Sequence, residues 1–403
     1  MIERVAYLSI HTSPLEAPGA GDAGGMNVYI DELSRTMAAR GVEVDVFTRS
    51  AAGTTAVTPV VPGYRVVEVP TASFGDGDAL ADAVGDFAEG VVKWAANQGA
   101  RYDIVHSHYW LSGWAGVLVQ DVLGAPLAIS FHTLGRVKAV NRRSDEPPPS
   151  LLRIAAETEV IARAGCVVAS TPIEAGELLE HYAAQPERLC VSPPGVDHER
   201  FSPGDRRAAR ARLGIGPEPV MLFAGRIQPL KGLDVSLAAF EVLARELPSL
   251  RFLVVGGPSG PQGEAELART RALARHMGLA DRVDVRGPLA HDVIPDAYRA
   301  ATVVHVPSRA ESFGLVAVEA QACGVPVVAA RVGGLPYVVR HDESGLLVDG
   351  WDPADHANAL RAVLTDPTTA RRLGDGALEL SERFSWSSTA DRLLELYGGI
   401  QHP

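Results

Sequence analysis

The sequence predicts an α/β protein made of two doubly wound, Rossmann-like domains that face a cleft between them. Short apolar runs alternate with amphipathic stretches along the chain, which is typical of parallel sheets covered by helices. The 403 residues exceed one ordinary domain and suit two domains of about 200 residues. The cluster Pro193-Pro194-Gly195 interrupts the alternation near the middle of the chain, as a linker does. We therefore expect one domain over residues 1–195 and a second over residues 196–385.

The first half of the chain carries the elements of one sheet. Its apolar runs predict strands at Val5–Ile10, Glu43–Phe47, Arg65–Val69, Ile104–His106, Leu127–Phe131, Cys166–Ser170 and Leu189–Val191. Its amphipathic stretches predict helices at Asn27–Arg40, Ala79–Asn97 and Leu151–Ala164.

The same alternation restarts after the cluster Ser202-Pro203-Gly204. Strands are predicted at Val220–Ala224, Arg251–Val255, Val283–Arg286, Val303–Val306 and Val327–Ala330. Helices are predicted at Asp234–Leu247, Glu264–His276, Asp292–Ala300, Gly314–Ala322, Ala354–Thr365, Thr368–Phe384 and Ser385–Gly399. Two successive domains of this kind place a ligand cleft between the carboxyl ends of their strands.

Composition limits the partners and the compartment. The net charge of −12 disfavours nucleic acid as the main partner, because phosphate backbones bind basic surfaces. Cys166, Cys190 and Cys323 are sparse and lack metal-ligand spacing, so we expect reduced thiols. We see no secretion signal and no apolar run of the ~20 residues that a membrane helix needs. A cytoplasmic protein without a membrane span is expected.

The stretch from Glu311 to Glu319 is the most informative part of the chain. Ser312 and Gly314 can open a helix, whose first backbone N–H groups and dipole suit a phosphate. Glu319 lies about two turns into that helix, where a carboxylate can accept hydrogen bonds from sugar hydroxyls. A diphosphate between a ribose and a second sugar describes a nucleotide sugar.

A second candidate segment runs from Gly225 to Gly232, directly after a predicted strand. Arg226 and Lys231 bracket a turn that contains proline. Arginine can hold a diphosphate with two hydrogen bonds, and lysine adds a point charge that offsets leaving-group charge. Two solvated surface cations would be the plain alternative. The position at a strand end and the companion Glu311–Glu319 stretch favour binding.

The first domain offers further candidates at its strand ends. Gly24 and Gly25 in Gly21–Asn27 permit close approach of a ligand, although the loop lacks the full dinucleotide fingerprint and a tight turn is the alternative. His11 follows the first strand, and in the predicted fold it would face the same cleft. The stretches His106–Trp110 and Phe131–Thr133 follow later strands. Their histidines, and His132 above all, can bind polyhydroxylated ligands or serve as structural histidines.

Five basic residues in the first domain form a local positive cluster that could bind an anionic acceptor: Arg136, Lys138, Arg142, Arg143 and Arg153. We expect Arg142 and Arg143 to be solvated loop residues instead. No metal site is predicted, since the histidines have no carboxylate or cysteine at ligand spacing.

These segments together resemble the retaining glycosyltransferases of the GT-B fold, family 4, over essentially the whole chain. More narrowly, they resemble the D-inositol 3-phosphate glycosyltransferases of actinobacterial mycothiol biosynthesis. The stretches that carry the resemblance are His11–Leu15, Gly21–Tyr29, His106–Gly113, Gly225–Lys231, Gly256–Gly260 and Glu311–Gln321.

The resemblance implies UDP-N-acetylglucosamine as donor, held mainly by the second domain. Arg226 and Lys231 would hold the diphosphate, Glu319 the ribose and Glu311 the hydroxyls of the transferred sugar. Ser312, Phe313 and Gly314 would complete the donor site, with Gly25 approaching from the first domain. The helix over residues 386–403 would cross back onto the first domain.

The resemblance also implies a small polyol acceptor, such as 1D-myo-inositol 3-phosphate. Its pocket would use His11, Asn27, Tyr109, Thr133 and Arg153, with His132 beside the reacting centre. The catalytic set would be His132, Arg226, Lys231 and Glu311. The chemistry needs no cofactor, a Mg²⁺ ion is compatible but not catalytic, and a homodimer is left open.

One departure from the family concerns the acceptor phosphate. The family carries a lysine for that phosphate in the loop before the second helix, whereas Thr71–Leu80 has no Lys or Arg and contains Asp76 and Asp78. Losing one charged contact would weaken binding by about 1.5–3 kcal/mol. An unphosphorylated or amino-bearing acceptor is therefore an alternative. A nucleotide-sugar-binding protein without catalysis and an epimerase of the same fold are further alternatives.

Overall fold

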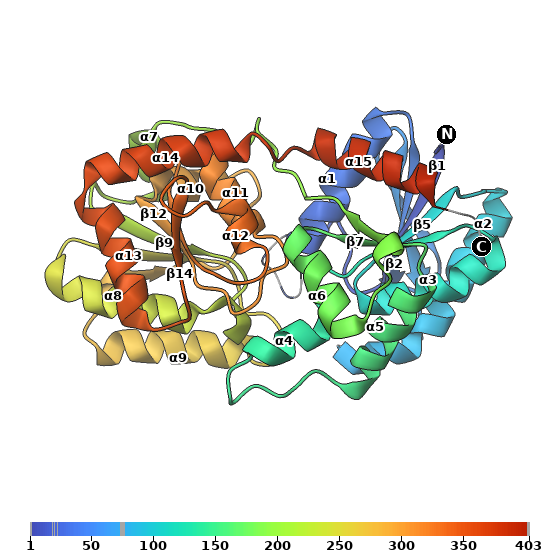
Figure 1. The fold of residues 1–403 in the computed structure, drawn as a ribbon, viewed down its shortest axis with the longest axis horizontal. Coiled ribbons are helices and arrows are strands. Elements are labelled where there is room, and N and C mark those ends of the chain that lie inside the picture. Colours follow the sequence, from blue (N-terminus) through green and yellow to red (C-terminus); the bar gives the residue numbers. More distant parts are fainter. Residues whose placement is uncertain (1, 18, 20, 22, 73–76, 401–403) are drawn as a thin grey trace.

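The computed structural model describes residues 2–17, 19, 21, 23–72 and 77–400 and shows two α/β domains side by side (Figure 1). Each domain has a central sheet with helices on both faces, as a doubly wound fold requires. The α/β class and the two Rossmann-like domains that the sequence predicts are confirmed.

The first sheet has the strand order β3-β4-β2-β1-β5-β6-β7-β8 and is parallel except for the β3–β4 pair. Its strands are β1 Arg4–Ser9, β2 Glu43–Ser50, β3 Ala56–Val61, β4 Tyr64–Pro70, β5 Ile104–His108, β6 Leu127–Ser130, β7 Cys166–Ala169 and β8 Leu189–Val191. Its helices are α1 Gly25–Ala39, α2 Val84–Gln98, α3 Trp110–Leu123, α4 Gly135–Asn141, α5 Leu151–Arg163 and α6 Pro172–Tyr182, with short 3₁₀ turns at Gly77–Ala83 and Pro186–Arg188.

The second sheet is parallel throughout, with the order β11-β10-β9-β12-β13-β14. Its strands are β9 Val220–Ala224, β10 Arg251–Val255, β11 Val283–Val285, β12 Val303–Val306, β13 Val327–Ala330 and β14 Gly345–Val348. The helices of this half are α7 Arg206–Leu213, α8 Leu233–Glu246, α9 Gly263–His276, α10 Ile294–Ala300, α11 Leu315–Ala322, α12 Leu335–Val338, α13 Pro353–Thr365, α14 Pro367–Ser381 and α15 Trp386–Gly399, with 3₁₀ turns at Pro229–Lys231 and Ala280–Arg282.

Several elements were not predicted from the sequence patterns, and two of them for clear physical reasons. The edge strand β3 is largely exposed, so it lacks the apolar alternation that marks a half-buried strand. Helix α3 is buried on most of its surface, so it lacks a polar face and a clear 3.6-residue period. The predicted helix Ala79–Asn97 starts as a 3₁₀ turn and becomes an α-helix only at Val84. Helices α4, α6, α7 and α12 and strand β14 were not predicted either.

The chain crosses between the two domains twice, and the two connecting segments run next to each other. Val196 donates its backbone N–H to the carbonyl of Phe384 at 3.3 Å and forms a parallel bridge with Ser385. A Cβ atom at Gly195 would lie 2.1 Å from the backbone nitrogen of Trp386, so only glycine fits there. The linker that the proline and glycine cluster predicts therefore lies against the second crossing of the chain.

Helix α15 follows this second crossing and lies on the first domain (Figure 1). Its apolar face, with Trp386, Ala390, Leu393 and Tyr397, is buried in the same core as Tyr7 and Tyr29. Helix α15 thus completes the core of the first domain. The chain therefore connects the two domains both before and after the second domain.

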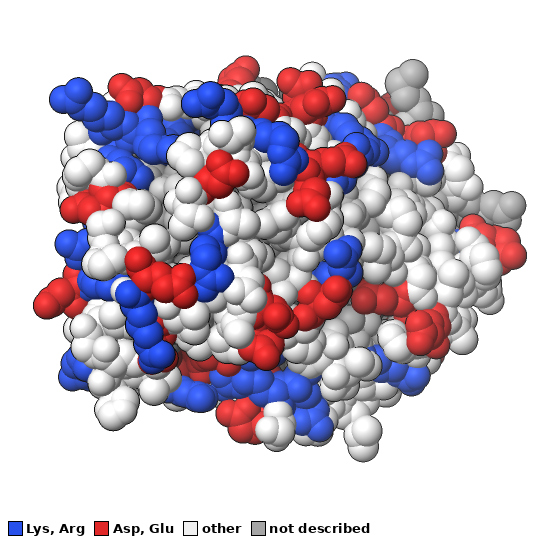
Figure 2. Space-filling view, turned by 60° about the vertical axis from the view of Figure 1, so that its left-hand side comes forward, with Lys and Arg blue, Asp and Glu red and all other residues white. Residues whose placement is uncertain are grey.

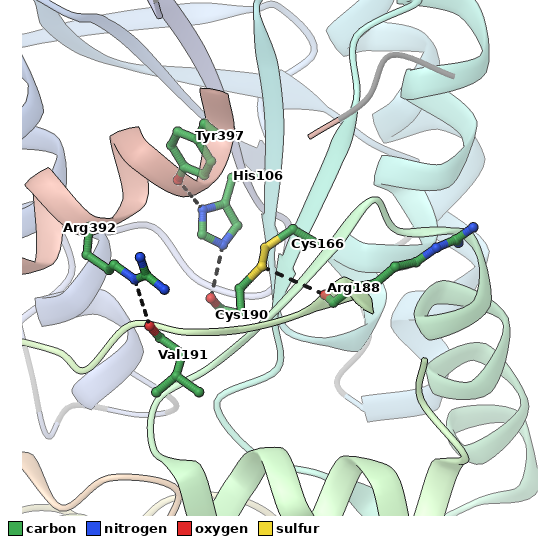
Figure 3. The surroundings of a disulfide bond; sticks show 8 residues. His106, Cys166, Arg188, Cys190, Val191, Arg392 and Tyr397 are labelled. Carbon is green, nitrogen blue, oxygen red and sulfur yellow. Dashed lines mark hydrogen bonds between the residues drawn. A yellow bond between two sulfur atoms is a disulfide. The ribbon is translucent and has the colours of Figure 1, made fainter. Parts of the chain in front are cut away.

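Cys166 and Cys190 form a disulfide between the neighbouring strands β7 and β8 (Figure 3). The expectation that all three cysteines are reduced thiols is therefore wrong for this pair. Cys323 is the free, buried one among the described residues. The sequence separates the pair by 24 residues, and only the pairing of β7 with β8 brings their Cα atoms to 6.2 Å.

The surface carries charges of both signs. Figure 2 shows acidic and basic side chains interspersed over one face, with no extended basic area there. Among the described residues, no helix is both long enough and apolar enough to cross a bilayer.

Candidate active site

The carboxyl ends of β9 and β12, which pair in the second sheet, bring the two main donor-side candidates together. Lys231 lies in the loop after β9, and Glu311 lies in the loop after β12. The Lys231 Nζ atom lies 2.6 Å from Glu311 Oε2, and the Ser308 hydroxyl donates to the same oxygen at 3.3 Å. Both side chains of the pair remain partly exposed at the cleft. The fold thus brings an ammonium group and a carboxylate that lie 80 residues apart in sequence into direct contact.

The turn between Glu311 and α11 is shaped by glycine. Gly314 precedes the helix with φ of 107°, which a residue with a side chain rarely adopts. The Ser312 hydroxyl does not cap α11, because it donates to the carbonyl of His132 in the first domain at 2.7 Å. Phe313 is 4% exposed and packs edge-on against Phe384, so its side chain belongs to the core.

Glu319 lies further along α11 and is paired with a residue that the sequence patterns did not single out. The Tyr298 hydroxyl donates to Glu319 Oε2 at 2.6 Å. Burial raises the pKa of Glu319 to about 7, and the hydrogen bond from Tyr298 opposes that shift only in part. The carboxyl is therefore poised between its neutral and its ionised form near neutral pH.

The glycine loop of the first domain meets Arg226 of the second. A Cβ atom at Gly24 would lie 2.9 Å from Arg226 Nε, so the absence of a side chain lets the guanidinium approach. A Cβ atom at Gly25 would lie 3.2 Å from Leu315 at the start of α11. On its other side, Arg226 donates to the Ser259 hydroxyl at 3.4 Å.

Asn27 holds the glycine loop together from inside. Its Oδ1 atom accepts from the Gly24 N–H at 2.9 Å, and its Nδ2 atom donates to Thr12 Oγ1 at 2.8 Å and to the Ser13 carbonyl at 2.6 Å. The side chain is 1% exposed. A direct contact of Asn27 with an acceptor stays a prediction, while its role in joining two loops is visible.

Three histidines at the ends of β5 and β6 form a stack, in which His106 and His108 are buried and His132 is half-buried. His106 lies 4.5 Å from His108 between ring centroids, and His108 lies 5.3 Å from His132. The Nδ1 atom of His108 and the Nε2 atom of His132 are 3.1 Å apart and share a hydrogen bond. Burial lowers the pKa of His132 to about 3, so its imidazole is neutral at physiological pH. His132 can take part in catalysis as a neutral hydrogen-bonding group, not as a cation.

The acceptor-side candidates cluster around Arg153. Its guanidinium donates to the Tyr109 hydroxyl at 3.0 Å and to the carbonyl and hydroxyl of Thr133 at 2.9 and 3.2 Å. It also donates from Nε to Glu157 at 2.7 Å. The ring of His11 lies 5.3 Å from that of Tyr109. The structure thus brings His11, Tyr109, Thr133 and Arg153 together.

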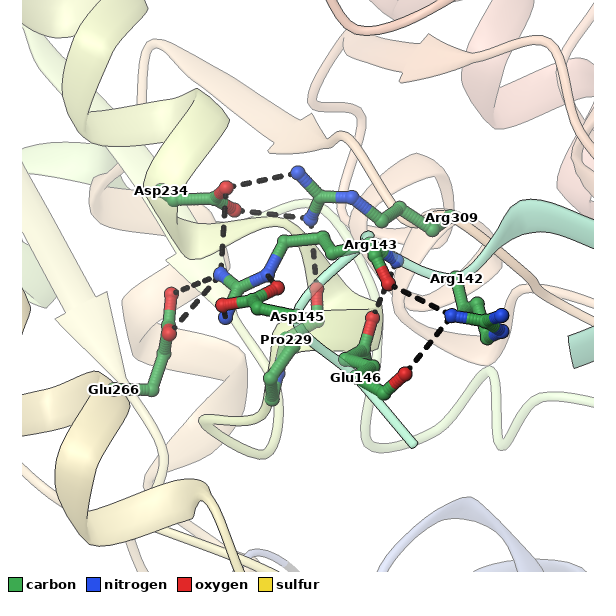
Figure 4. Close-up of polar contacts among 8 residues, drawn as sticks. All are labelled: Arg142, Arg143, Asp145, Glu146, Pro229, Asp234, Glu266 and Arg309. Carbon is green, nitrogen blue, oxygen red and sulfur yellow. Dashed lines mark hydrogen bonds and ion pairs between the residues drawn. The ribbon is translucent and has the colours of Figure 1, made fainter. Parts of the chain in front are cut away.

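Arg143 crosses from the first domain into a group of acidic side chains in the second (Figure 4). It donates to both oxygens of Glu266 at 3.1 and 3.2 Å and lies 3.6 Å from Asp234. Asp234 is also held by Arg309, which donates in addition to the Pro229 carbonyl at 2.7 Å. The expectation of a solvated Arg143 is wrong, because the loop after α4 carries it into the second domain. Arg142, its neighbour, is exposed and bonds its own loop at Glu146.

A small cavity lies between the two domains, next to Glu311 and Thr133. It is lined from the first domain by Thr133, Leu134, Val137, Lys138 and Glu177, and from the second by Ala310, Glu311 and Ser312. A larger hollow lies near Thr302 and Pro326, which precede β12 and β13. It is at the amino ends of the strands, the opposite edge from Lys231, so the smaller cavity is the candidate site. Among the described residues, no group of three or more His, Cys, Asp or Glu could hold a metal ion.

Two matches to family models cover most of the chain. Residues 23–200 match "Glycosyltransferase Family 4", and residues 205–379 match "Glycosyl transferases group 1". The D-inositol 3-phosphate glycosyltransferase of Streptomyces bingchenggensis is 46% identical over 405 residues, which covers 98% of this chain and 89% of that protein. The D-inositol 3-phosphate glycosyltransferase of Rhodococcus jostii is 48% identical, with 98% and 88% covered.

Solved structures agree with this fold. A sucrose-phosphate synthase from Thermosynechococcus elongatus superposes with a TM-score of 0.90 at 32% identity and 98% coverage of both chains. HepE of Anabaena in complex with UDP-glucose gives a TM-score of 0.77 at 21% identity, with 98% of this chain and 99% of that chain covered, which supports the fold alone. The chain is therefore a glycosyltransferase of the GT-B fold that belongs to the family of the actinobacterial D-inositol 3-phosphate glycosyltransferases.

Proposed function

We propose that the protein transfers N-acetylglucosamine from UDP-N-acetylglucosamine to 1D-myo-inositol 3-phosphate with retention of configuration, as a step of mycothiol biosynthesis. The observation that carries the proposal is the pairing of Lys231 with Glu311 at the strand ends of the second domain. Glu311 of this pair lines the same cavity as Thr133, which Arg153 contacts from the acceptor side. The relatives from Streptomyces bingchenggensis and Rhodococcus jostii, both D-inositol 3-phosphate glycosyltransferases, support the inositol phosphate acceptor.

On the donor side, Arg226 and Lys231 would hold the diphosphate, because both cations follow β9 and reach the cleft. Glu319 would accept from the ribose hydroxyls, and Glu311 would accept from hydroxyls of the transferred sugar. Gly25 and the backbone of Ser312 to Gly314 would lie against the donor. His11, Asn27, Tyr109, Thr133 and Arg153 would form the acceptor pocket.

The expected reaction needs no enzymic nucleophile. Glu311, a carboxylate close to the reacting centre, is ion-paired with Lys231 and serves better to orient than to attack. The acceptor hydroxyl attacks the anomeric carbon on the face that UDP leaves, the bond to the phosphate oxygen breaks, and that phosphate takes the hydroxyl proton. Arg226 and Lys231 stabilise the departing charge, and neutral His132 orients the sugar.

An acceptor panel tests this proposal. UDP release is measured from UDP-N-acetylglucosamine with inositol 3-phosphate, free inositol and an amino-cyclitol, with GDP-sugars in parallel. Release that depends on inositol 3-phosphate, with an α-linked product by NMR, is the expected result. UDP binding without release for any acceptor would support the binding-protein alternative, and conversion of the donor alone would support an epimerase.

A second candidate keeps the donor and replaces the acceptor by an unphosphorylated or amino-bearing cyclitol. The observation that favours it is the absence of Lys and Arg from Thr71–Leu80. The segment around Asp76 lies outside the described residues. Turnover of inositol 3-phosphate with a micromolar KM would reject this candidate. A cytoplasmic location, a non-catalytic Mg²⁺ and a homodimer stay predictions.

A further inference from the structure

Lysine is rare in this chain compared with arginine. The sequence has three lysines, Lys93, Lys138 and Lys231, whereas its other 34 basic residues are arginine (37 Lys and Arg in total). Lys93 is exposed and paired with Glu89 at 2.6 Å. Lys231 is paired with Glu311. Within the part of the chain that the structure describes, the Lys138 side chain has neither an ion-pair partner nor a hydrogen bond.

Lys138 lies on α4 and lines the small cavity between the domains. Thr133 of the acceptor cluster lines the same cavity, and so do Glu311 and Ser312 of the donor side. The side chain is half-buried, so its ammonium group has lost part of its contact with water. Such a group is normally stabilised by a carboxylate.

Among the charges that act on Lys138, the two with the largest effects are positive. Burial, followed by the charge of Arg153 and then that of Arg226, lowers the pKa of Lys138 to about 8. Glu146 and Glu157 oppose this shift with smaller effects, and Glu157 already accepts from Arg153 and Gly135.

Glu177 lines the same cavity, yet it is not the missing partner. Burial, followed by the charge of Glu180, raises the pKa of Glu177 to about 7, whereas a bonded ammonium would lower it. Lys138 is therefore acted on most strongly by two other cations, and among the described residues it has no carboxylate within ion-pair distance. An anion from outside would relieve this repulsion.

We propose that Lys138 and Arg153 together bind the phosphate group of the acceptor, so that Lys138 supplies the cation that Thr71–Leu80 lacks. The acceptor is favoured over the donor diphosphate because Lys138 and Thr133 line the same cavity and Arg153 bonds Thr133. Arg226, by contrast, lies against Gly24 and Ser259. This inference rests on the proposed function, since it assigns a residue to its acceptor.

The first experiment separates acceptor from donor binding. Lys138→Met removes the charge and keeps most of the chain length, and it is expected to raise KM for inositol 3-phosphate by about 10- to 100-fold. KM for UDP-N-acetylglucosamine should change by less than about threefold. Lys138→Arg should restore most of the affinity, and Lys93→Met is the matched control. An unchanged KM for inositol 3-phosphate in Lys138→Met would overturn the inference and leave the proposed function intact.

The second experiment does not depend on turnover. The protein is labelled with acetic anhydride, and each of its three lysines is followed by mass spectrometry in its own peptide. Inositol 3-phosphate, and inorganic phosphate at higher concentration, should protect Lys138, while free inositol should not. Lys93 is the internal reference. If the wild type turns over no inositol 3-phosphate, the proposed function fails. Protection of Lys138 by inorganic phosphate would still support the anion site, and lack of protection would overturn it.

Discussion

At the scale of single residues, the ion pair between Lys231 and Glu311 is the observation on which the proposed function depends. The 2.6 Å contact holds an ammonium group at the end of the donor-side loop before any substrate arrives. Such preorganised charge is effective because it needs little rearrangement when charge develops on the leaving group.

Lys231→Ala removes that charge, and we expect kcat to fall by about 10²- to 10³-fold. The measurement is UDP release at saturating donor and acceptor. Lys93→Ala, a change at an exposed lysine paired with Glu89, should keep full activity. Near-normal turnover of Lys231→Ala would contradict the assignment of Lys231 to the diphosphate.

Glu319 predicts a pH dependence of donor binding. Its pKa is raised to about 7 by burial, so the free protein holds a proton there at mildly acid pH. Ribose hydroxyls that donate to the carboxylate favour its ionised form, and binding must then release this proton. Affinity for UDP-N-acetylglucosamine should therefore rise by about tenfold between about pH 5.5 and about pH 8.

Calorimetry without acceptor, in buffers of different ionisation enthalpy, measures both the affinity and the released proton. The intact nucleotide sugar is used because its diphosphate does not titrate in this range, unlike that of UDP. Glu319→Gln should bind with no such pH dependence. A pH dependence that persists in this variant would remove Glu319 from the ribose site.

At the scale of elements, the loop between α4 and α5 acts as a bridge. Arg143 leaves the first domain and bonds Glu266, while Arg309 holds Asp234 and the Pro229 carbonyl beside Lys231 (Figure 4). Contact between the domains is thereby connected to the loop that carries Lys231.

We expect Arg143→Met to weaken the contact between the two domains by about 1.5–3 kcal/mol, because its charged hydrogen bonds to Glu266 are lost and that carboxylate is left buried. Small-angle scattering of the unliganded protein should show a larger radius of gyration. Arg142→Met is the matched control, since Arg142 bonds only its own loop. An unchanged radius in Arg143→Met would show that this bridge does not hold the domains together.

The disulfide between β7 and β8 predicts the number of thiols that can be titrated. If Cys166 and Cys190 are joined, the denatured, unreduced protein should react with one equivalent of thiol reagent, at Cys323. Reduction should lower the free energy of unfolding by about 3 kcal/mol, because the bond closes a loop with a separation of 24 residues. Titration of three thiols without reductant would contradict the disulfide.

At the scale of the whole molecule, α15 makes the first domain depend on the last residues of the chain. The Tyr397 hydroxyl bonds His106 Nδ1 and lies 3.4 Å from the Tyr7 hydroxyl. Tyr397→Phe leaves His106 Nδ1 without this partner in a buried position, so we expect a loss of about 1–3 kcal/mol in urea denaturation. An unchanged midpoint would mean that α15 contributes only its apolar face.

The sequence by itself determined the class of fold and the donor-side motifs. Apolar runs must be buried in sheets, so the strands of both domains, except β3 and β14, were predictable from local pattern. Arg226, Lys231, Glu311 and Glu319 stand at strand ends or on the helix that follows, where parallel sheets present their ligands, and this could be predicted from composition and order alone.

Only the tertiary structure decided which residues from distant segments meet. Tyr298 bonds Glu319, Arg143 bonds Glu266, and Cys166 bonds Cys190, and none of these pairs has a sequence spacing that marks it. The environment of Lys138 is of the same kind, because the charges of Arg153 and Arg226, from distant segments, act on it only in the folded protein. Local pattern reports how one segment buries its own surface, whereas partners across a cleft follow from how the two sheets and their loops are placed.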